Sequence, residues 1–152
     1  MIRLILEGLL QVEDDEDEFD IDLEQGPCLS AGFTLKKLAH LIRNDIIDLS
    51  INFIAENIQS QNNWQQKYAG LIALSMITEG PDKQKFLEVI AQLLDQLLQL
   101  FSDQSPKVRE AVCHVFKQLA EHHPDIFLDQ QVSDQFLPLL KDLIDDKPKV
   151  SN

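Results

Sequence analysis

The most concentrated chemistry in the sequence lies between residues 13 and 24. Nine of these twelve residues are Asp or Glu, and Phe19 is the one aromatic residue among them. Carboxylates at this density attract Arg- and Lys-rich segments and speed encounter with them. A neighbouring aromatic ring can stack on a bound guanidinium or pack against a lysine stem. We therefore predict a site for a basic partner, formed by Glu13, Asp14, Asp15, Glu16, Asp17, Glu18, Phe19, Asp20, Asp22 and Glu24.

Two other interpretations of this acidic run compete with a binding site. A run of like charges is most often a solvated linker. Calcium is a further candidate, because a loop that starts at Asp20 has acids at its first, third and fifth positions. Glycine then falls at position seven rather than six, and Ala31 stands at position twelve, where an EF-hand needs glutamate. The calcium loop therefore fails, whereas the solvated linker stays open.

The other reactive side chains do not form a catalytic or metal-binding pattern. The sequence contains no GxSxG, P-loop or HExxH motif, and Cys28 and Cys113 lack the spacing of a metal site. Both cysteines fall in apolar helical patterns, which predicts small buried thiols in a reducing compartment. His122 and His123 close a predicted helix, where partial positive charge suits the helix dipole. We therefore expect no enzyme, no metal and no cofactor.

The charge of the chain is strongly localised. The 152 residues carry a formal net charge of −13, from 26 acids against 13 bases. Outside the acidic run, 17 acids nearly balance the 13 bases, so most of the net charge comes from that run. With so few clustered Lys and Arg residues, direct binding of DNA or RNA is not expected. The segment MIRLILEGLL is interrupted by Glu7 and lacks a cleavage site, so it does not match a signal peptide. Polar residues also break the leucine-rich stretch at 86–101, so we expect no membrane contact and a soluble protein of the cytosol or nucleus.

Apolar residues recur at helical spacing along nearly the whole chain, and no stretch alternates as a strand does. Three dipeptides are typical of helix ends: Asn44-Asp45, Gly80-Pro81 and Ser105-Pro106. The pattern predicts helices at roughly 1–11, 28–43, 46–59, 63–79, 84–101, 106–122 and 132–145. Pro138 should kink the last of them.

The predicted helices repeat in pairs. SPKVRE at 105–110 returns as KPKVSN at 147–152, a shift of 42 residues, and the same shift backward leads from Arg109 to Lys67. Ala31-Gly32 recurs as Ala69-Gly70 at a shift of 38. A period near 40 with two helices is typical of HEAT repeats, which stack into an all-α solenoid. We predict a single HEAT array of about three and a half helix pairs: 1–43 with an acidic insertion at 13–26, 44–80, 81–123 and an incomplete repeat at 124–152.

These motifs together resemble the importin-β family of nuclear transport receptors. An acidic run, an aromatic and then a proline and cysteine opening a small-residue helix (DDEDEF … GPCLSAGFTL) are similar to the family's central acidic-loop repeat. The likeness continues in register through Trp64, ITEGP at 77–81, VRE at 108–110, FLPLLKDLI at 136–144 and PKVSN at 148–152. The acidic insertion distinguishes this family from the alternative, a HEAT scaffold subunit of another assembly such as a phosphatase.

The resemblance implies a protein-binding solenoid that engages an importin-α-like adaptor or basic cargo and the GTPase Ran. It implies an inner face built from the helices that start near Cys28, Trp64 and Pro106, and nucleoporin binding mostly through repeats outside this segment. It also implies a protein that moves between cytoplasm and nucleus through the pore. His114 falls where the family has an inner-face tryptophan, which departs from the family pattern. The partner-binding residues predicted beyond the acidic run are Trp64, Glu110, His114 and Glu121.

The two ends of the sequence lack the polar face that caps a complete solenoid. The chain starts with a lone apolar helix and stops where a new helix should begin, so we expect a segment of a longer array. Leu4, Ile5 and Leu9 should then be exposed at one end. Exposed apolar surface of this kind drives self-association.

Overall fold

The computed structural model of the chain is built of helices. It describes residues 2–12, 26–61, 63–128, 130, 133, 134 and 138, so the acidic run lies outside the described residues. The described helices are α1 (Ile2–Leu9), α2 (Gly26–Ile42), α3 (Asp45–Ile58), α4 (Trp64–Met76), α5 (Lys83–Leu100), α6 (Pro106–His122) and the short 3-10 helix η2 (Pro124–Leu128). The described residues contain no strand.

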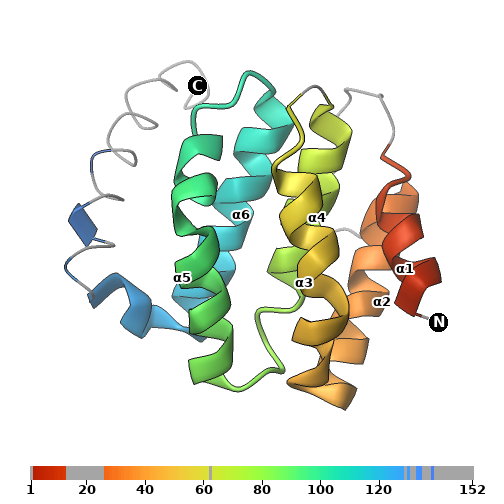
Figure 1. Cartoon of the computed structure of the whole chain (residues 1–152), viewed down its shortest axis with the longest axis horizontal. Coiled ribbons are helices and arrows are strands. Elements are labelled where there is room, and N and C mark those ends of the chain that lie inside the picture. The colour runs from red at the N-terminus through yellow and green to blue at the C-terminus, as the bar shows by residue number, and fades with distance from the viewer. Residues whose placement is uncertain are drawn as a thin grey trace, which may run out of the picture.

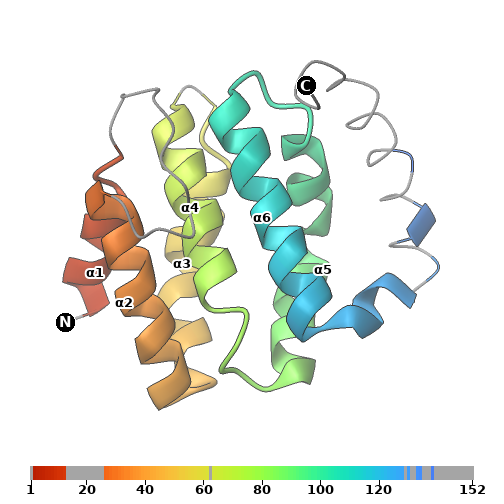
Figure 2. The ribbon, with the colours of Figure 1, turned by 180° about the vertical axis from the view of Figure 1, so that it is seen from behind.

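The helices form two layers. α1, α3 and α5 lie side by side on the face turned to the viewer in Figure 1, and α2, α4 and α6 lie on the opposite face, which Figure 2 shows. Successive helices are antiparallel, so the connections within each pair meet at the top of Figure 1 and the connections between pairs meet at the bottom. This is the all-α solenoid arrangement that the paired repeats predicted.

Six of the seven predicted helices are confirmed, with ends that differ by a few residues. α2 begins two residues earlier than predicted, because Pro27 fits the first turn of a helix, where its missing N–H is not needed. The seventh helix, predicted over 132–145, lies outside the described residues except at Ser133, Asp134 and Pro138. That helix, its kink at Pro138 and the predicted repeat boundaries stay predictions.

The helix-end signals had different outcomes. Ser105 caps α6 as predicted: its hydroxyl accepts a hydrogen bond from the Val108 N–H, with Pro106 in the first turn. Asn44 precedes α3 but does not cap it, because its side-chain oxygen accepts instead from the Asp82 N–H of the next connection at 2.5 Å. Gly80 does not end α4, which stops four residues earlier at Met76.

α4 ends early because side-chain hydroxyls satisfy its last carbonyls. The Thr78 hydroxyl lies 3.2 Å from the Leu74 carbonyl and 2.9 Å from the Ser75 carbonyl, as a donor that the two oxygens share. The Leu74 and Ser75 carbonyls thus keep a partner where the helix ends, and the left-handed Gly80 (φ 127°) serves the turn beyond it.

The hydrophobic core is centred on α4. Every residue from Tyr68 to Met76 is buried, so the helix is enclosed on all sides by its neighbours. The sequence YAGLIALSM allows this because it is apolar or small around the whole circumference rather than along one stripe. Gly70 permits the close approach of α3, since a Cβ there would lie 2.9 Å from the Ile58 side chain.

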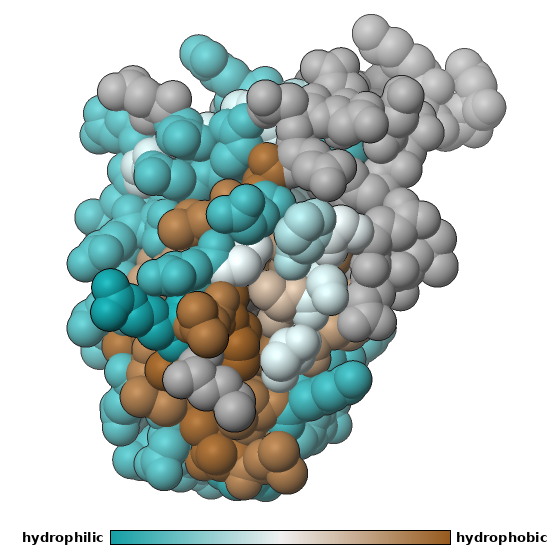
Figure 3. Space-filling view, turned by 90° about the vertical axis from the view of Figure 1, so that its right-hand side faces the viewer, coloured by the Kyte–Doolittle hydropathy of each residue, from teal (hydrophilic) through white to brown (hydrophobic). Residues whose placement is uncertain are grey.

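Apolar side chains gather on the end of the molecule formed by α1 and α2, which Figure 3 shows. Leu4 is 72% exposed there and Leu41 78%. The exposure predicted for Ile5 and Leu9 is wrong: their four-residue spacing turns both side chains into the core. None of the described helices is long and apolar enough to cross a membrane.

Candidate partner-binding surface

The predicted partner residues of α6 lie on one side of that helix. Glu110, His114 and Glu121 are spaced by four and seven residues, which places them in one stripe. Both glutamates are exposed and His114 is partly buried. Lys117, also exposed, belongs to the same stripe, so the described part of this surface carries charges of both signs.

Tyr68 of α4 lies between α2 and α6. It is fully buried, and burial raises the pKa of its hydroxyl, with the nearby Glu110 carboxylate on α6 raising it further. Burial also raises the pKa of the Cys28 thiol to about 12, so this cysteine stays protonated and unreactive. The prediction of a small buried thiol is confirmed for Cys28, whereas Cys113 is partly exposed.

Trp64 opens α4 and is partly buried against the core. Its ring meets the Tyr68 ring edge-on, with centroids 6.3 Å apart and planes at 78°. Asn63 caps the helix by accepting a hydrogen bond from the Gln66 N–H, which fixes the first turn from which Trp64 projects. The ring therefore packs against the core and stays partly exposed.

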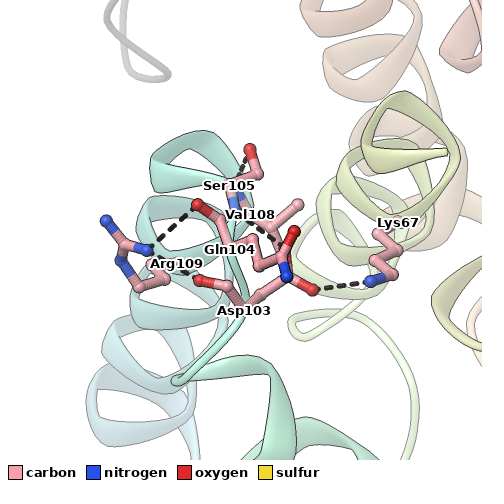
Figure 4. A network of polar contacts seen from close by, with 6 residues as sticks. All are labelled: Lys67, Asp103, Gln104, Ser105, Val108 and Arg109. Carbon is pink, nitrogen blue, oxygen red and sulfur yellow. Dashed lines mark hydrogen bonds and ion pairs between the residues drawn. The ribbon is translucent and has the colours of Figure 1, made fainter. Parts of the chain in front are cut away.

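A buried polar tie joins the second and third helix pairs beside Trp64. Lys67 of α4 donates to the Asp103 carboxylate at 2.6 Å, and the two side chains are only 17% and 11% exposed. Asp103 also accepts from the Ser105 N–H through its other carboxylate oxygen, and the Arg109 guanidinium donates to the Asp103 carbonyl at 2.7 Å (Figure 4). Lys67 and Arg109 are the two residues that the 42-residue shift aligns, and each is the fourth residue of its helix.

An open pocket of about 1020 Å³ lies directly beside this tie. Its walls are the connection between α3 and α4, the connection between α5 and α6, and the side of α5. Side-chain amides dominate the lining: Gln59, Gln61, Asn63, Gln96, Gln99 and Gln104. We call the edge of the molecule formed by connections 59–63 and 101–105 the open edge. Sequence reasoning missed this pocket, because it is made by glutamines that are far apart in the chain.

The opposite edge, which we call the closed edge, consists of the connections at 43–44, 77–82 and 123–128. His123, predicted only as a helix-end residue, is buried there. Its Nε2–H donates to the Thr78 carbonyl at 2.8 Å, and its ring stacks on Phe86 at 5.3 Å. His123 is thus a core residue that joins two helix pairs, and only its place directly before Pro124 hinted that it lies outside the helix.

The closed edge carries ion pairs as well. Glu79 lies 3.4 Å from His122 and 3.8 Å from His40, so one carboxylate meets the ends of α2 and α6. Lys83, the first residue of α5, pairs with Asp125 of η2. Within the part of the chain that the structure describes, no group of three His, Cys, Asp or Glu residues could hold a metal ion.

The structure brings Trp64 and Glu110 close to one another through Tyr68, and places Glu121 further along α6. The ten residues predicted in the acidic run, Glu13 to Glu24 with Phe19, lie outside the described residues and stay predictions. α1 ends at Leu9 and α2 begins at Gly26, and these two helix ends lie on the same side of the array as the open edge.

Comparison with known proteins finds a repeat family and sequence relatives that are similar to this chain. A HEAT-repeat family model matches residues 93–123. Importin subunit beta-1 of Saccharomyces cerevisiae is 28% identical over 120 residues, covering 79% of this chain and 14% of the relative. Importin subunit beta-1 of Arabidopsis thaliana is 28% identical over 160 residues, covering 99% of this chain and 18% of the relative.

Solved structures agree with the sequence relatives. The structure of Kap95 in complex with Nup1 superposes with a TM-score of 0.87 at 27% identity, covering 98% of this chain and 17% of that one. Yeast importin-β (Kap95) superposes with a TM-score of 0.73 at 26% identity, covering 82% and 14%. The chain thus spans between 14% and 18% of the length of these proteins, and is an all-α HEAT solenoid segment similar to them over most of its own length.

Proposed function

With this likeness to importin-β as the premise, we propose that the chain is part of a nuclear transport receptor. In this proposal it binds partner proteins without chemistry of its own, and it moves between cytoplasm and nucleus through the pore. The acidic run binds basic segments of an importin-α-like adaptor or cargo and contributes to binding of the GTPase Ran. Trp64, Glu110, His114 and Glu121 supply further contacts along the inner helices.

The observation that carries the proposal is the acidic run itself. It concentrates nine carboxylates in twelve residues, while the remaining 17 acids and 13 bases of the chain nearly balance. The relatives support the choice of partners, because structures similar to this chain include Kap95 bound to RanGDP and Kap95 bound to Nup1. Nucleoporin contact through repeats outside this segment is therefore part of the proposal as well.

The direct test neutralises the acidic run. Replacing Asp14, Asp15, Glu16, Asp17 and Glu18 by Asn or Gln should slow association with an Arg/Lys-rich peptide and with Ran-GTP. The loss should be largest at low salt and shrink as salt rises, because exposed charges are screened beyond a Debye length of about 8 Å at physiological ionic strength. Stopped-flow or surface-plasmon kinetics at two salt concentrations measure both effects.

A matched control removes the same charge elsewhere. Five exposed acids of the outer helices α3 and α5 can be neutralised together: Asp45, Asp48, Glu56, Glu88 and Asp95. This control changes the net charge equally but leaves the acidic run intact. Equal slowing of association in both variants would mean that only the net charge of the protein matters. Unchanged binding in the acidic-run variant would mean that the run is a solvated linker and not a binding site.

Phe19→Ala separates stacking from charge. If the ring stacks on a bound Arg or Lys, its loss should raise the dissociation rate with little dependence on salt. A lower melting temperature with unchanged affinity would instead make Phe19 a structural residue. The melting curve and the kinetics of the same variant distinguish the two results.

His114→Trp tests the departure from the family pattern. His114 is partly exposed in the stripe that also contains Glu110 and Glu121, so a tryptophan there would add a large flat surface beside two carboxylates. We expect affinity for a basic adaptor peptide to rise several-fold, since cation–π contacts contribute about 0.5–1 kcal/mol at exposed sites. Unchanged affinity would remove the stripe of α6 from the proposed surface and leave the acidic run as the site.

A further inference from the structure

We propose that the amide-lined pocket of the open edge binds an extended, uncharged polar peptide segment. This inference rests on the proposed function in one respect, namely that the solenoid binds proteins. It assigns a second site with a chemistry different from that of the acidic run: main-chain recognition by side-chain amides rather than attraction of basic residues.

The size and form of the pocket suit a peptide that passes through it. The volume of about 1020 Å³ is at the upper end of the range of about 300–1,000 Å³ that is usual for ligand sites. The pocket is open where two successive connections diverge, with Ile58 and Leu100 supplying apolar surface among the polar groups. An extended chain needs such an open path, because each of its residues advances the backbone by about 3.3 Å.

The pocket is electrically neutral. The charged side chains that line it are Lys67 and Asp103, and these neutralise one another at 2.6 Å. A phosphate or a polyanion therefore meets no uncompensated positive charge, and a basic peptide meets no uncompensated carboxylate. Neutral donors and acceptors are the chemistry that remains.

The amide groups are available for such a ligand. The Gln96 side-chain oxygen is buried and has no hydrogen-bond partner, which leaves an acceptor that costs free energy unless a donor reaches it. The side chains of Gln59, Gln61 and Gln99 line the same pocket and make no hydrogen bond with the described residues. Each glutamine amide offers both a donor and an acceptor, as a peptide unit does, so one side chain can pair with a main-chain N–H and C=O.

Trp64 forms part of the wall. Its ring is held edge-on to Tyr68 and is partly buried, so its position is set before a ligand arrives. A rigid aromatic surface favours packing of a ligand side chain or of the flat peptide unit. Because Trp64 is the only tryptophan of the sequence, its fluorescence reports directly on occupancy of this pocket.

The test uses the full chain and capped peptides built from Gly, Ser, Asn and Gln, with an Arg/Lys-rich peptide and a glucan oligosaccharide as competitors. Titration of the uncharged peptides should change Trp64 fluorescence and the side-chain amide resonances of the pocket glutamines. Gln96→Leu should weaken binding about fivefold to tenfold, the effect of one lost hydrogen bond. Gln92→Leu, an exposed residue one turn earlier on the same stripe of α5 and outside the pocket lining, should leave it unchanged.

The variants also separate this site from the acidic run. Neutralising the run should weaken binding of the basic peptide and leave binding of the uncharged one unchanged, whereas Gln96→Leu should weaken binding of the uncharged peptide and leave that of the basic one unchanged. Unchanged binding of the basic peptide by the neutralised variant would therefore overturn the proposed function and not the pocket. The pocket proposal is overturned if uncharged peptides change neither signal, if Gln92→Leu weakens them equally, if the oligosaccharide binds in their place, or if Gln96→Leu stabilises the fold with unchanged peptide affinity.

Discussion

At the closed edge the connections between helix pairs contact one another directly, and a side chain at Gly80 would meet the Ala39 backbone. At the open edge the corresponding connections part around a pocket. The closed edge is joined at every step by a specific link: the Asn44 side chain to the Asp82 N–H, Thr78 to His123, and Lys83 to Asp125. In the described part of the open edge, Lys67 and Asp103 form the corresponding link.

The difference shows how a stacked array can be both precise and able to bind. Close contacts at one edge fix how far each helix pair is rotated against the next, because packed interiors do not deform continuously. The separation of the connections at the open edge then follows from the rotation that the closed edge fixes. A pocket formed in this way needs little local reinforcement, since its walls are held from the opposite side of the molecule.

Gly80→Ala is expected to have the largest effect on stability and would break the closed edge. A Cβ there would lie 2.5 Å from the Ala39 carbonyl oxygen, and the φ of 127° is strained for any other residue. Crowding and backbone strain together should lower the free energy of unfolding by about 3 kcal/mol, measured by urea denaturation. Gly26→Ala is the matched control: its φ is also positive at 84° but no atom lies within 4 Å, so the loss should stay near 1 kcal/mol.

His123→Leu should have the next largest effect. It removes the donor to the Thr78 carbonyl and the stacking on Phe86, and leaves a buried acceptor without a partner. We expect the free energy of unfolding to fall by about 2 kcal/mol. His122→Leu changes the partly exposed neighbour and should lower the free energy of unfolding by no more than about 0.5 kcal/mol. Equal losses in the two variants would contradict the structural role of His123.

Asp103→Asn tests the link between Lys67 and Asp103 at the open edge. The change keeps an acceptor for the Ser105 N–H but removes the charge that pairs with Lys67. We expect a loss of about 1–1.5 kcal/mol in the free energy of unfolding, because hydrogen bonds to charged groups are stronger than neutral ones. Lys67→Met in the Asp103→Asn background should then cost little more, and a fully additive double mutant would show that the two side chains act separately.

Glu79→Gln should have the smallest effect, although Glu79 belongs to the closed edge. Its contacts with His40 and His122 are 3.8 and 3.4 Å long, and its side chain is 46% exposed. An exposed pair of this kind contributes no more than about 0.5 kcal/mol. A loss as large as that of His123→Leu would mean that charge, rather than packing, fixes the closed edge.

Sequence patterns predicted the helices better than the edges. The cap and proline of Ser105-Pro106 act locally, so their outcome follows from adjacent residues. The end of α4 could not be predicted in this way, because it depends on how the Thr78 hydroxyl reaches two carbonyls of the previous turn. Asn44 failed as a cap for a similar reason, since a partner 38 residues away takes its side chain. Contacts at that distance leave no periodic signal.

The candidate site shows the same division. Glu110, His114 and Glu121 could be placed in one stripe from helical spacing alone. The pocket could not be predicted, because glutamines at 59, 61, 96, 99 and 104 are ordinary solvent-facing residues until two connections come together. His123 was predicted only as a helix-end residue, and the fold makes it part of the core.

The central position of α4 also governs how the protein opens. Amide hydrogens exchange with solvent through partial unfolding, and the slowest are those whose exposure requires the most structure to separate. α4 contacts α1, α2, α3 and α6, so no single helix pair can detach without uncovering part of it. Its amides should therefore exchange only in the global opening event, whereas those of the eight-residue α1 exchange through local fraying. We therefore expect the three described helix pairs to unfold as one cooperative unit rather than as independent repeats.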